Sequence, residues 1–146
     1  MSSSPTSSGR AAAVRVYLDS NCVIYFVERN PTWWPKVVAR IARFRAAGDQ
    51  LVVGDLTQAE CLVGPFKTRD ITLEASYRAF FTDPDITVLP MTAVVCERAA
   101  RLRAAYSFKL PDALHLATAI EHGCGLFLSA DSKLARCADI AVEVVR

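Results

Sequence analysis

Five short, almost wholly apolar runs recur along this chain, and segments with helical periodicity separate them. A strand that is apolar on both faces must be buried on both faces, as in a parallel sheet covered by helices. The runs therefore predict an α/β fold, namely a three-layer α/β/α sandwich around a mostly parallel central sheet. The expected strands are residues 14–19, 50–55, 86–90, 125–129 and 141–145.

The segments between these runs have the spacing of amphipathic helices. In residues 35–48, apolar side chains recur every three or four positions, and Gly48 is a typical residue at a helix end. Ser20 or Asn21 is expected to cap the first helix, because short polar side chains accept hydrogen bonds from the unpaired backbone N–H groups of the first turn. The predicted helices are residues 20–30, 35–48, 56–64, 70–83, 92–107 and 110–120, with a short helix near 132–137.

Length and composition are those of one globular domain. The chain has 146 residues, of which 52% are hydrophobic, enough for an apolar core without disulfide bridges. We expect residues 1–13 to be a disordered tail and residues 14–146 to be the domain. No apolar run approaches the roughly 18 residues of a membrane span. The formal net charge of +2 neither requires nor opposes a nucleic-acid partner.

The cysteine pattern indicates free thiols. The chain has an odd number of cysteines, none forms a C-x-x-C pair, and the histidines do not complete a zinc spacing with them. The first residues lack the apolar segment of a secretory signal. We therefore expect reduced thiols in the core of a cytoplasmic protein. The cysteines are Cys22, Cys61, Cys96, Cys124 and Cys137.

Four acidic residues are placed so that a parallel sheet would bring them to one edge. Asp19 ends the first predicted strand, Asp131 follows the fourth, and Asp112 opens the helix that leads into the fourth. Glu60 lies on the helix after the second strand. Open parallel sheets bind ligands outside the carboxyl ends of their strands, where the connections change direction. We therefore expect all four carboxylates at that edge.

Each acid taken alone has a structural alternative. Asp112 would complement the helix dipole, an effect of about 0.3–1 kcal/mol. Asp131 would cap the short helix after it. Glu60 would close a capping box with Thr57 in the sequence TQAE. Asp19 is harder to explain in this way, because a charge at the end of a buried strand needs a partner.

Taken together, the four carboxylates indicate a cation site. Two carboxylates about 5 Å apart repel by roughly 3 kcal/mol at an effective dielectric of about 20. No Lys or Arg lies within two residues of Asp19 or Glu60 in the sequence. Sites made of oxygen ligands suit Mg²⁺ or Mn²⁺, which bind through a few carboxylates and keep several waters. Such a site handles phosphate oxygens and water.

Four stretches of the sequence resemble the PIN domain, and most closely the VapC-type toxins of toxin–antitoxin pairs. They are VYLDSN, LTQAECL, KLPDALHLATAIEHG and LFLSAD, which have the family's spacing. The resemblance implies an α/β/α sandwich and an endoribonuclease that cleaves RNA with Mg²⁺, for which Mn²⁺ substitutes. The partners that we expect are an RNA such as tRNA or rRNA, a cognate antitoxin and, in a homodimer, a second copy of the chain.

The resemblance also implies roles for individual residues. Asp19 and Asp112 correspond to the firmest metal ligands, and Asn21 and Ser129 correspond to the polar companions of the acids. Asp131 would complete the ligand set. The catalytic and metal-binding quartet falls on Asp19, Glu60, Asp112 and Asp131.

Three further groups of residues are candidates for contacts. His115, three residues after Asp112, is expected to be a half-buried packing residue, although it is within reach of the site. A basic stripe on residues 35–48 would either bind the RNA backbone or form a solvated helix face. Aromatic residues would anchor the antitoxin, which the family binds near its first helices, with one of the two tryptophans packed in the core. The stripe is Lys36, Arg40 and Arg43, and the aromatic residues are Tyr25, Trp33 and Trp34.

Three other functions fit parts of the pattern. A haloacid-dehalogenase-like phosphatase has an Asp at the end of its first strand but needs a second Asp two residues on, where this chain has Asn21. A phospho-receiver domain needs a Lys after its last strand and adjacent acids near its first, and the chain has neither. A PIN-like scaffold that only binds RNA or protein stays open, although the complete acidic quartet speaks against it.

Overall fold

Five parallel strands form the sheet at the centre of the described part of the chain. The computed structural model describes residues 12–146, so the tail predicted for residues 1–13 lies almost entirely outside it. The strands are β1 (Arg15–Leu18), β2 (Gln50–Gly54), β3 (Ile86–Leu89), β4 (Leu126–Ser129) and β5 (Val142–Val144). Their order is β3-β2-β1-β4-β5, with β1 in the middle, and the predicted parallel sheet is confirmed.

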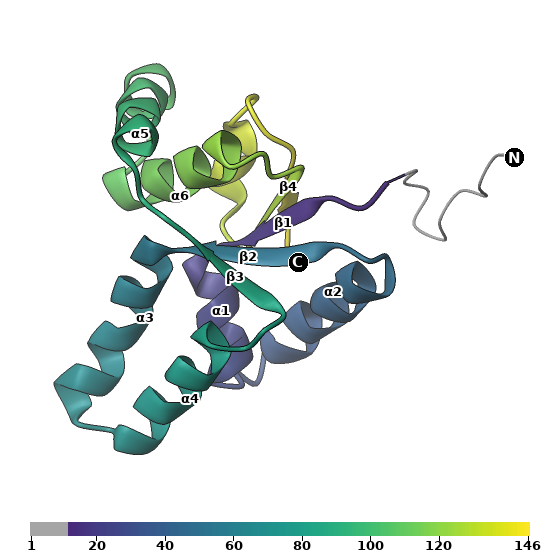
Figure 1. Ribbon diagram of the computed structural model, residues 1–146, viewed down its shortest axis with the longest axis vertical. Helices are drawn as coiled ribbons and strands as arrows, with labels where there is room; N and C mark the ends of the chain where they lie inside the picture. Colours follow the sequence, from purple (N-terminus) through teal and green to yellow (C-terminus); the bar gives the residue numbers. More distant parts are fainter. Residues whose placement is uncertain (1–11) are drawn as a thin grey trace, which may run out of the picture.

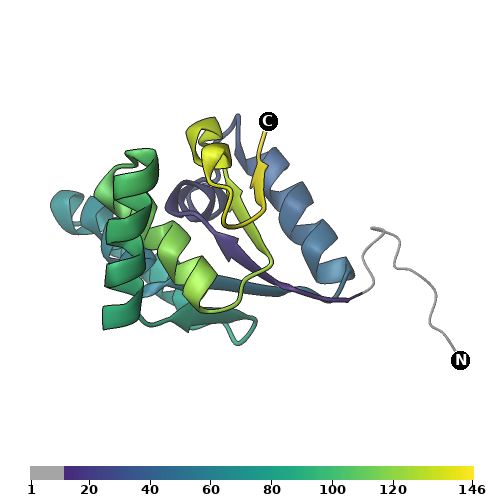
Figure 2. The ribbon, with the colours of Figure 1, turned by 90° about the horizontal axis from the view of Figure 1, so that it is seen from above.

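Helices connect the strands and cover both faces of the sheet. They are α1 (Ser20–Val27), α2 (Trp34–Ala46), α3 (Asp55–Thr68), α4 (Ile71–Phe81), α5 (Ala93–Tyr106), α6 (Leu110–Glu121) and the 3-10 helix η1 (Ser132–Arg136). Helices α1 to α4 pack on one face, whereas α5, α6 and η1 pack on the other (Figure 1 and Figure 2). The predicted three-layer sandwich is therefore confirmed.

The distribution of helices follows from the strand order. The chain moves outward from β1 to β2 and β3, then returns across the sheet to β4 and moves on to β5. Connections between parallel strands are almost always right-handed, so a reversal of direction transfers the connecting helices to the opposite face. The reversal occurs between β1 and β4, and ligands of open α/β sheets bind at such a point.

Strand β1 is buried on both of its faces. Val16 and Leu18 belong to the apolar core beneath α1 to α4, whereas Tyr17 belongs to the core beneath α5 and α6. All three are at most 1% exposed. This double burial is the reason why the strand is a continuous apolar run in the sequence.

Helix α3 is longer than the sequence predicts. It continues to Thr68, past Gly64 and Pro65, where the prediction ended it. Pro65 removes a backbone hydrogen bond from the helix, but its side chain is buried and α3 packs against α4. Arg69, with a left-handed φ of 55°, ends the helix instead. Packing of the pair of helices therefore outweighs the local preference of Pro65.

The cysteines are free thiols, but one of them is not in the core. Cys96 is exposed on α5, because the buried stripe of that helix runs through Val95, Ala99 and Leu102 and leaves position 96 outside. The prediction of a core thiol is therefore wrong for Cys96. Over residues 12–146, no helix combines the length and apolar character that crossing a membrane requires.

Candidate functional site

Asp19 lies where the central strand ends and the first helix begins. Its Oδ1 accepts a hydrogen bond from the backbone N–H of Ser20 at 2.8 Å, so Asp19 is the N-cap of α1. The prediction of Ser20 or Asn21 as the cap is wrong. Asp19 is only 5% exposed, and burial raises the pKa of its carboxyl group. The central strand therefore ends in a carboxylate that is costly to ionise.

The two predicted polar companions bind the carboxylate of Asp19 to the end of β4. Ser129 Oγ donates to Asp19 Oδ2 at 2.7 Å. Asn21 Nδ2 lies 3.4 Å from the same oxygen and 3.3 Å from Ser129 Oγ. Asn21 Oδ1 accepts from the backbone N–H of Ala130 at 3.2 Å. Side chains thus join the carboxyl ends of β1 and β4, which are neighbours in the sheet.

Asp131 is the N-cap of η1. Its Oδ1 accepts from the backbone N–H of Lys133 at 3.0 Å, and its own N–H donates to Ser129 Oγ at 2.9 Å. The structural alternative for this residue is therefore confirmed. No hydrogen bond within residues 12–146 involves Asp131 Oδ2, so capping leaves one carboxylate oxygen for a ligand.

Asp112 lies half-buried in the first turn of α6. Burial raises the pKa of its carboxyl group, and the charges of Asp19 and Asp131 raise it further. The Coulomb interaction between carboxylates falls with distance, so effects of this kind require that the three side chains lie near one another. The structure thus places Asp112 within electrostatic reach of Asp19 and Asp131, and the convergence of all four acids on one ion stays a prediction.

Glu60 lies in the middle of α3, and the predicted capping box is wrong. The helix begins five residues earlier, and Thr57 Oγ1 accepts from the backbone N–H of Gly54 at 3.0 Å. Glu60 Oε1 accepts instead from Ser20 Oγ at 2.7 Å and lies 2.6 Å from His115 Nε2. The hydrogen bond with His115 lowers the pKa of Glu60. Hydrogen bonds with Ser20 and His115 therefore stabilise the charge of Glu60.

His115 is closer to the acids than the sequence predicts. The expectation of a half-buried packing residue is wrong, because His115 is 1% exposed and both ring nitrogens have polar partners. Its Nδ1 lies 2.7 Å from the hydroxyl of Tyr17, and its Nε2 also lies 3.1 Å from Ser20 Oγ. One feature of the sequence does indicate that His115 lies near the acids: it follows Asp112 by about one helical turn.

The quartet offers oxygen donors of the kind that hard cations prefer. Among residues 12–146, no three His, Cys, Asp or Glu side chains surround one point closely enough to form a ready cation site. Mg²⁺ keeps several of its waters, however, and binds proteins through as few as one or two carboxylates. The donor chemistry of the quartet therefore fits such an ion.

A family model matches the chain over residues 16–140, and it is that of the PIN domain. The chain belongs to the PIN domain family. The matched range contains the whole acidic quartet and both polar companions, and it confirms the resemblance seen in the sequence motifs. No curated protein sequence matches the chain.

Solved structures share the fold of this PIN domain at low sequence identity. A chain of the DNA-bound VapBC complex from Salmonella typhimurium has a TM-score of 0.73 at 16% identity, covering 91% of this chain and 99% of that chain. A chain of VapBC2 from Rickettsia felis, bound to a promoter DNA fragment, has a TM-score of 0.71 at 15% identity. The match covers 90% of this chain and 99% of that chain. VapC20 from Mycobacterium tuberculosis, a sarcin–ricin loop cleaving toxin, has a TM-score of 0.67 at 12% identity. The match covers 84% of this chain and 95% of that chain.

The basic stripe of this PIN domain is partly paired with a carboxylate. Arg40 Nε lies 2.8 Å and Arg43 Nη2 lies 2.6 Å from Glu143 Oε2, on strand β5. The ammonium group of Lys36 lies 5.0 Å from the centre of the Trp33 ring. The stripe therefore carries less free positive charge than its sequence indicates, and its role in RNA binding stays a prediction.

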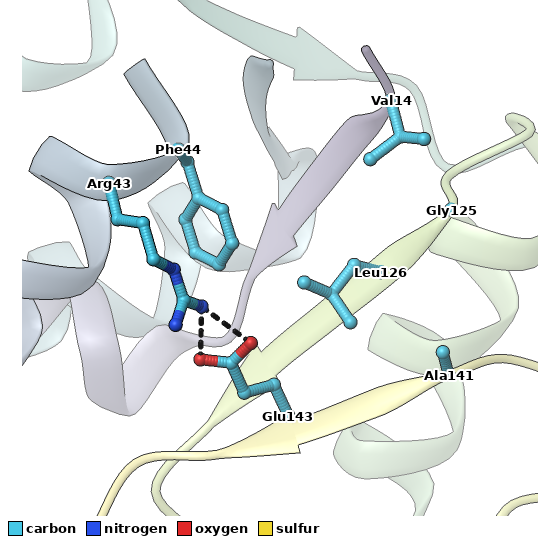
Figure 3. Close-up of a pocket in the computed structure, with 7 residues that line it drawn as sticks. All are labelled: Val14, Arg43, Phe44, Gly125, Leu126, Ala141 and Glu143. Atoms are coloured by element: carbon cyan, nitrogen blue, oxygen red, sulfur yellow. Dashed lines mark hydrogen bonds and ion pairs between the residues drawn. The ribbon is translucent and has the colours of Figure 1, made fainter. Parts of the chain in front are cut away.

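Figure 3 shows a pocket beside the pair formed by Arg43 and Glu143. Val14, Gly125 and Ala141 line it, and they precede β1, β4 and β5 respectively. The pocket is therefore at the amino ends of the strands, whereas the acids gather at the carboxyl ends.

The predicted aromatic residues form one corner of the molecule. The rings of Tyr25 and Trp33 are stacked with their centres 5.3 Å apart, and Trp33 packs against the core, as predicted for one tryptophan. The guanidinium group of Arg29 lies 5.5 Å from the centre of the Trp34 ring. Trp34 also lines a groove that reaches Phe80 of α4. The corner thus presents an aromatic surface between α1, α2 and α4.

Replacing Asp112 with Asn should leave the metal-free protein equally stable or more stable at pH 7.5. The raised pKa means that ionising Asp112 costs free energy in the folded state only. This penalty sets in above the unfolded pKa of about 3.9, so the gain from Asp112→Asn should shrink as the pH falls towards 4. Thermal unfolding at several pH values measures it.

Asp55→Asn is the matched control, because Asp55 is an exposed acid in the first turn of α3. It should leave the melting temperature unchanged or lower it slightly through the helix dipole. If Asp112→Asn instead lowers the free energy of unfolding by more than about 1 kcal/mol, the role of Asp112 is only to stabilise the N-terminus of α6.

Replacing Ser129 with Ala should destabilise the metal-free protein by about 1–3 kcal/mol. The change removes a donor from the buried carboxylate of Asp19 and leaves the N–H of Asp131 without its acceptor. Urea unfolding at pH 7.5 measures the effect, with the exposed Ser132→Ala as the control. Equal stability of the two variants would show that the hydroxyl of Ser129 does not support Asp19.

Proposed function

We propose that this PIN domain is a Mg²⁺- or Mn²⁺-dependent endoribonuclease that acts as the toxin of a toxin–antitoxin pair. The observation that carries the proposal is the setting of Asp112, where burial raises the pKa of the carboxyl group and the nearby charges of Asp19, Asp131 and Glu60 raise it further. Like charges kept within reach of one another favour a cation as their partner. The four acids also occupy the positions of the acidic residues in the family's sequence pattern.

The environment of each acid supports a separate role. Asp19 and Asp112 would be the main ligands, and Asp131 would add its unbonded Oδ2. Glu60 would hold a ligand water or act as the base. A bound divalent cation supplies an activated water and neutralises charge on the phosphate. The hydrogen bonds from Ser129 and from the first N–H of α1 hold the Asp19 carboxylate in one orientation.

The proposed substrate is structured RNA, such as tRNA or rRNA. The support is the fold similarity to VapC20, described as a sarcin–ricin loop cleaving toxin. On this proposal the basic stripe contacts RNA phosphates, which would compete with Glu143 for Arg40 and Arg43. Lys36, which faces only an aromatic ring among the contacts described above, is free of that competition.

The purified protein should cleave a mixture of tRNA and rRNA with Mg²⁺ or Mn²⁺ and stop when EDTA is added. Asp19→Asn should lower the cleavage rate by about 100-fold or more, the scale for losing one charge-stabilising group. Asn is as good an N-cap as Asp, so the start of α1 should survive the change. Gel analysis of RNA fragments and calorimetry with Mn²⁺ provide the measurements.

Asp70→Asn is the matched control, because Asp70 is the N-cap of α4 and makes the same type of bond to the backbone of Leu73. It should cleave RNA like the wild type. Cleavage that continues at full rate in EDTA would refute the metal mechanism. RNA binding without any cleavage would favour the scaffold alternative.

We propose the cognate antitoxin and a second copy of the chain as protein partners. The groove beside Trp34 has the aromatic lining that an amphipathic helix of an antitoxin would bury. For the homodimer, helices α3 and α4 offer exposed apolar side chains at Val63, Phe66 and Ile71. Chains of VapBC complexes share the fold, which supports the partner class.

Trp34→Ala should weaken binding of the antitoxin by more than about 1 kcal/mol, as expected for a buried aromatic anchor. The antitoxin to test is the product of a small gene beside this one, measured by calorimetry with the purified pair. Val94→Ala, which changes an exposed apolar residue on α5, is the control and should bind normally. Equal affinity of both variants and the wild type would remove the aromatic corner from the interface.

A further inference from the structure

A line of polar groups crosses the apolar layer beneath α6 and ends at Glu60. Tyr17 is fully buried in the central strand, with its ring stacked on Phe127 at 5.2 Å. Its hydroxyl lies 2.7 Å from His115 Nδ1 and 3.5 Å from Thr57 Oγ1. On the other side of the ring, His115 Nε2 lies 2.6 Å from Glu60 Oε1. The imidazole thus links a buried phenol to an acid of the quartet.

The donors and acceptors along this line have one consistent direction. Thr57 Oγ1 accepts from the backbone N–H of Gly54, so its own hydrogen can point to the oxygen of Tyr17. The hydrogen of Tyr17 is then available for His115 Nδ1. A carboxylate has no hydrogen to give, so its 2.6 Å separation from Nε2 requires the hydrogen on Nε2. A Glu side chain with its ordinary pKa of about 4.3 is ionised at neutral pH and offers such a carboxylate.

Gly54 provides the space that this arrangement needs. Its φ of −115° is open to any residue, so backbone conformation does not require glycine here. A Cβ at this position would lie only 2.6 Å from the hydroxyl oxygen of Tyr17. The phenol cannot easily move away, because its ring is packed against Phe127 in the core. Glycine at position 54 therefore keeps the Tyr17 hydroxyl beside His115.

We infer that His115 is a positioning residue, which donates from Nε2 to Glu60 Oε1 and so leaves Glu60 Oε2 for the cation or its water. This inference rests on the proposed function. The side chain of Glu60 is 34% exposed and has three rotatable bonds, so it needs external support to keep one orientation. Ser20 Oγ supplies a second donor to the same oxygen from α1. Together the two donors fix a side chain of α3 from two other helices.

The hydrogen on Nε2 can be observed directly in the metal-free protein. Nitrogen-15 NMR of the imidazole distinguishes the protonated ring nitrogen from the bare one. We expect the Nε2–H form for His115, with its signal changed in Glu60→Gln and in Tyr17→Phe. Protonation of Nδ1 alone would overturn the inference, because the ring would then have no hydrogen to donate to Glu60.

Mn²⁺ affinity tests the consequence for the site. His115→Leu removes the donor and should weaken Mn²⁺ binding about 10- to 100-fold, the usual effect of losing a residue that orients a ligand. His115→Gln, which can still donate an N–H, should recover part of that loss. In the Glu60→Gln background, His115→Leu should have no further effect, because the oriented carboxylate is already absent. Calorimetry without RNA provides the measurement.

The other end of the polar line provides variants that leave the imidazole in place. Tyr17→Phe keeps the stacked ring and removes only the hydroxyl, and Gly54→Ala displaces that hydroxyl. Both should weaken Mn²⁺ binding less than His115→Leu does. Matched controls are His122→Leu, at the other end of α6, and Tyr106→Phe, whose hydroxyl contacts Asp139. Both controls should bind Mn²⁺ like the wild type.

The outcomes separate this inference from the proposed function. Wild-type affinity in a folded His115→Leu, as shown by its melting curve, overturns the positioning role and leaves the metal site intact. An additive loss in the double variant His115→Leu, Glu60→Gln also overturns it, because His115 would then act independently of Glu60. A wild type that binds no Mn²⁺ overturns the proposed function, and the Nε2–H signal alone then decides whether His115 orients Glu60.

Discussion

The buried carboxylate of Asp19 is the constraint on which the rest of the site depends. It stands at the end of the central strand, almost out of reach of solvent, so hydrogen bonds from backbone and hydroxyl donors must stabilise its charge. Those donors come from α1 and from β4, and they fix the relative positions of both elements. The same bonds bring Asp131 beside Asp19, because Ser129 binds the two residues at once.

The fold was predictable from the sequence because its cause is local. Strand β1 is apolar from Val16 to Leu18, since both of its faces are covered there, and the helical periodicity between strands is equally direct. The order of the strands was not predictable in the same way, because it depends on which strand the returning chain meets. Pro65 shows the limit of local rules, since helix packing carries α3 past it.

The acids of the site were predictable as a group, but their hydrogen bonds were not. A carboxylate at the end of a buried strand is conspicuous in a sequence, and so are acids at helix starts. Two cap assignments failed. Helix α1 begins at Ser20 itself, so its N-cap is Asp19, and α3 begins five residues before Glu60. His115 was underestimated because its partners, Tyr17 and Glu60, are distant in the sequence and come together only in the folded sheet.

The position of β4 beside β1 has a consequence for the order of events during synthesis. Strand β1 is made early, yet one of its two neighbours is separated from it by more than a hundred residues. Until β4 leaves the ribosome, β1 has an unpaired edge and Asp19 lacks the hydroxyl of Ser129. Long-range pairings of this kind form late in folding. The growing chain thus has an incomplete acidic centre until β4 is made, and the pairing of β4 with β1 closes the middle of the sheet and supplies Ser129 to Asp19 together.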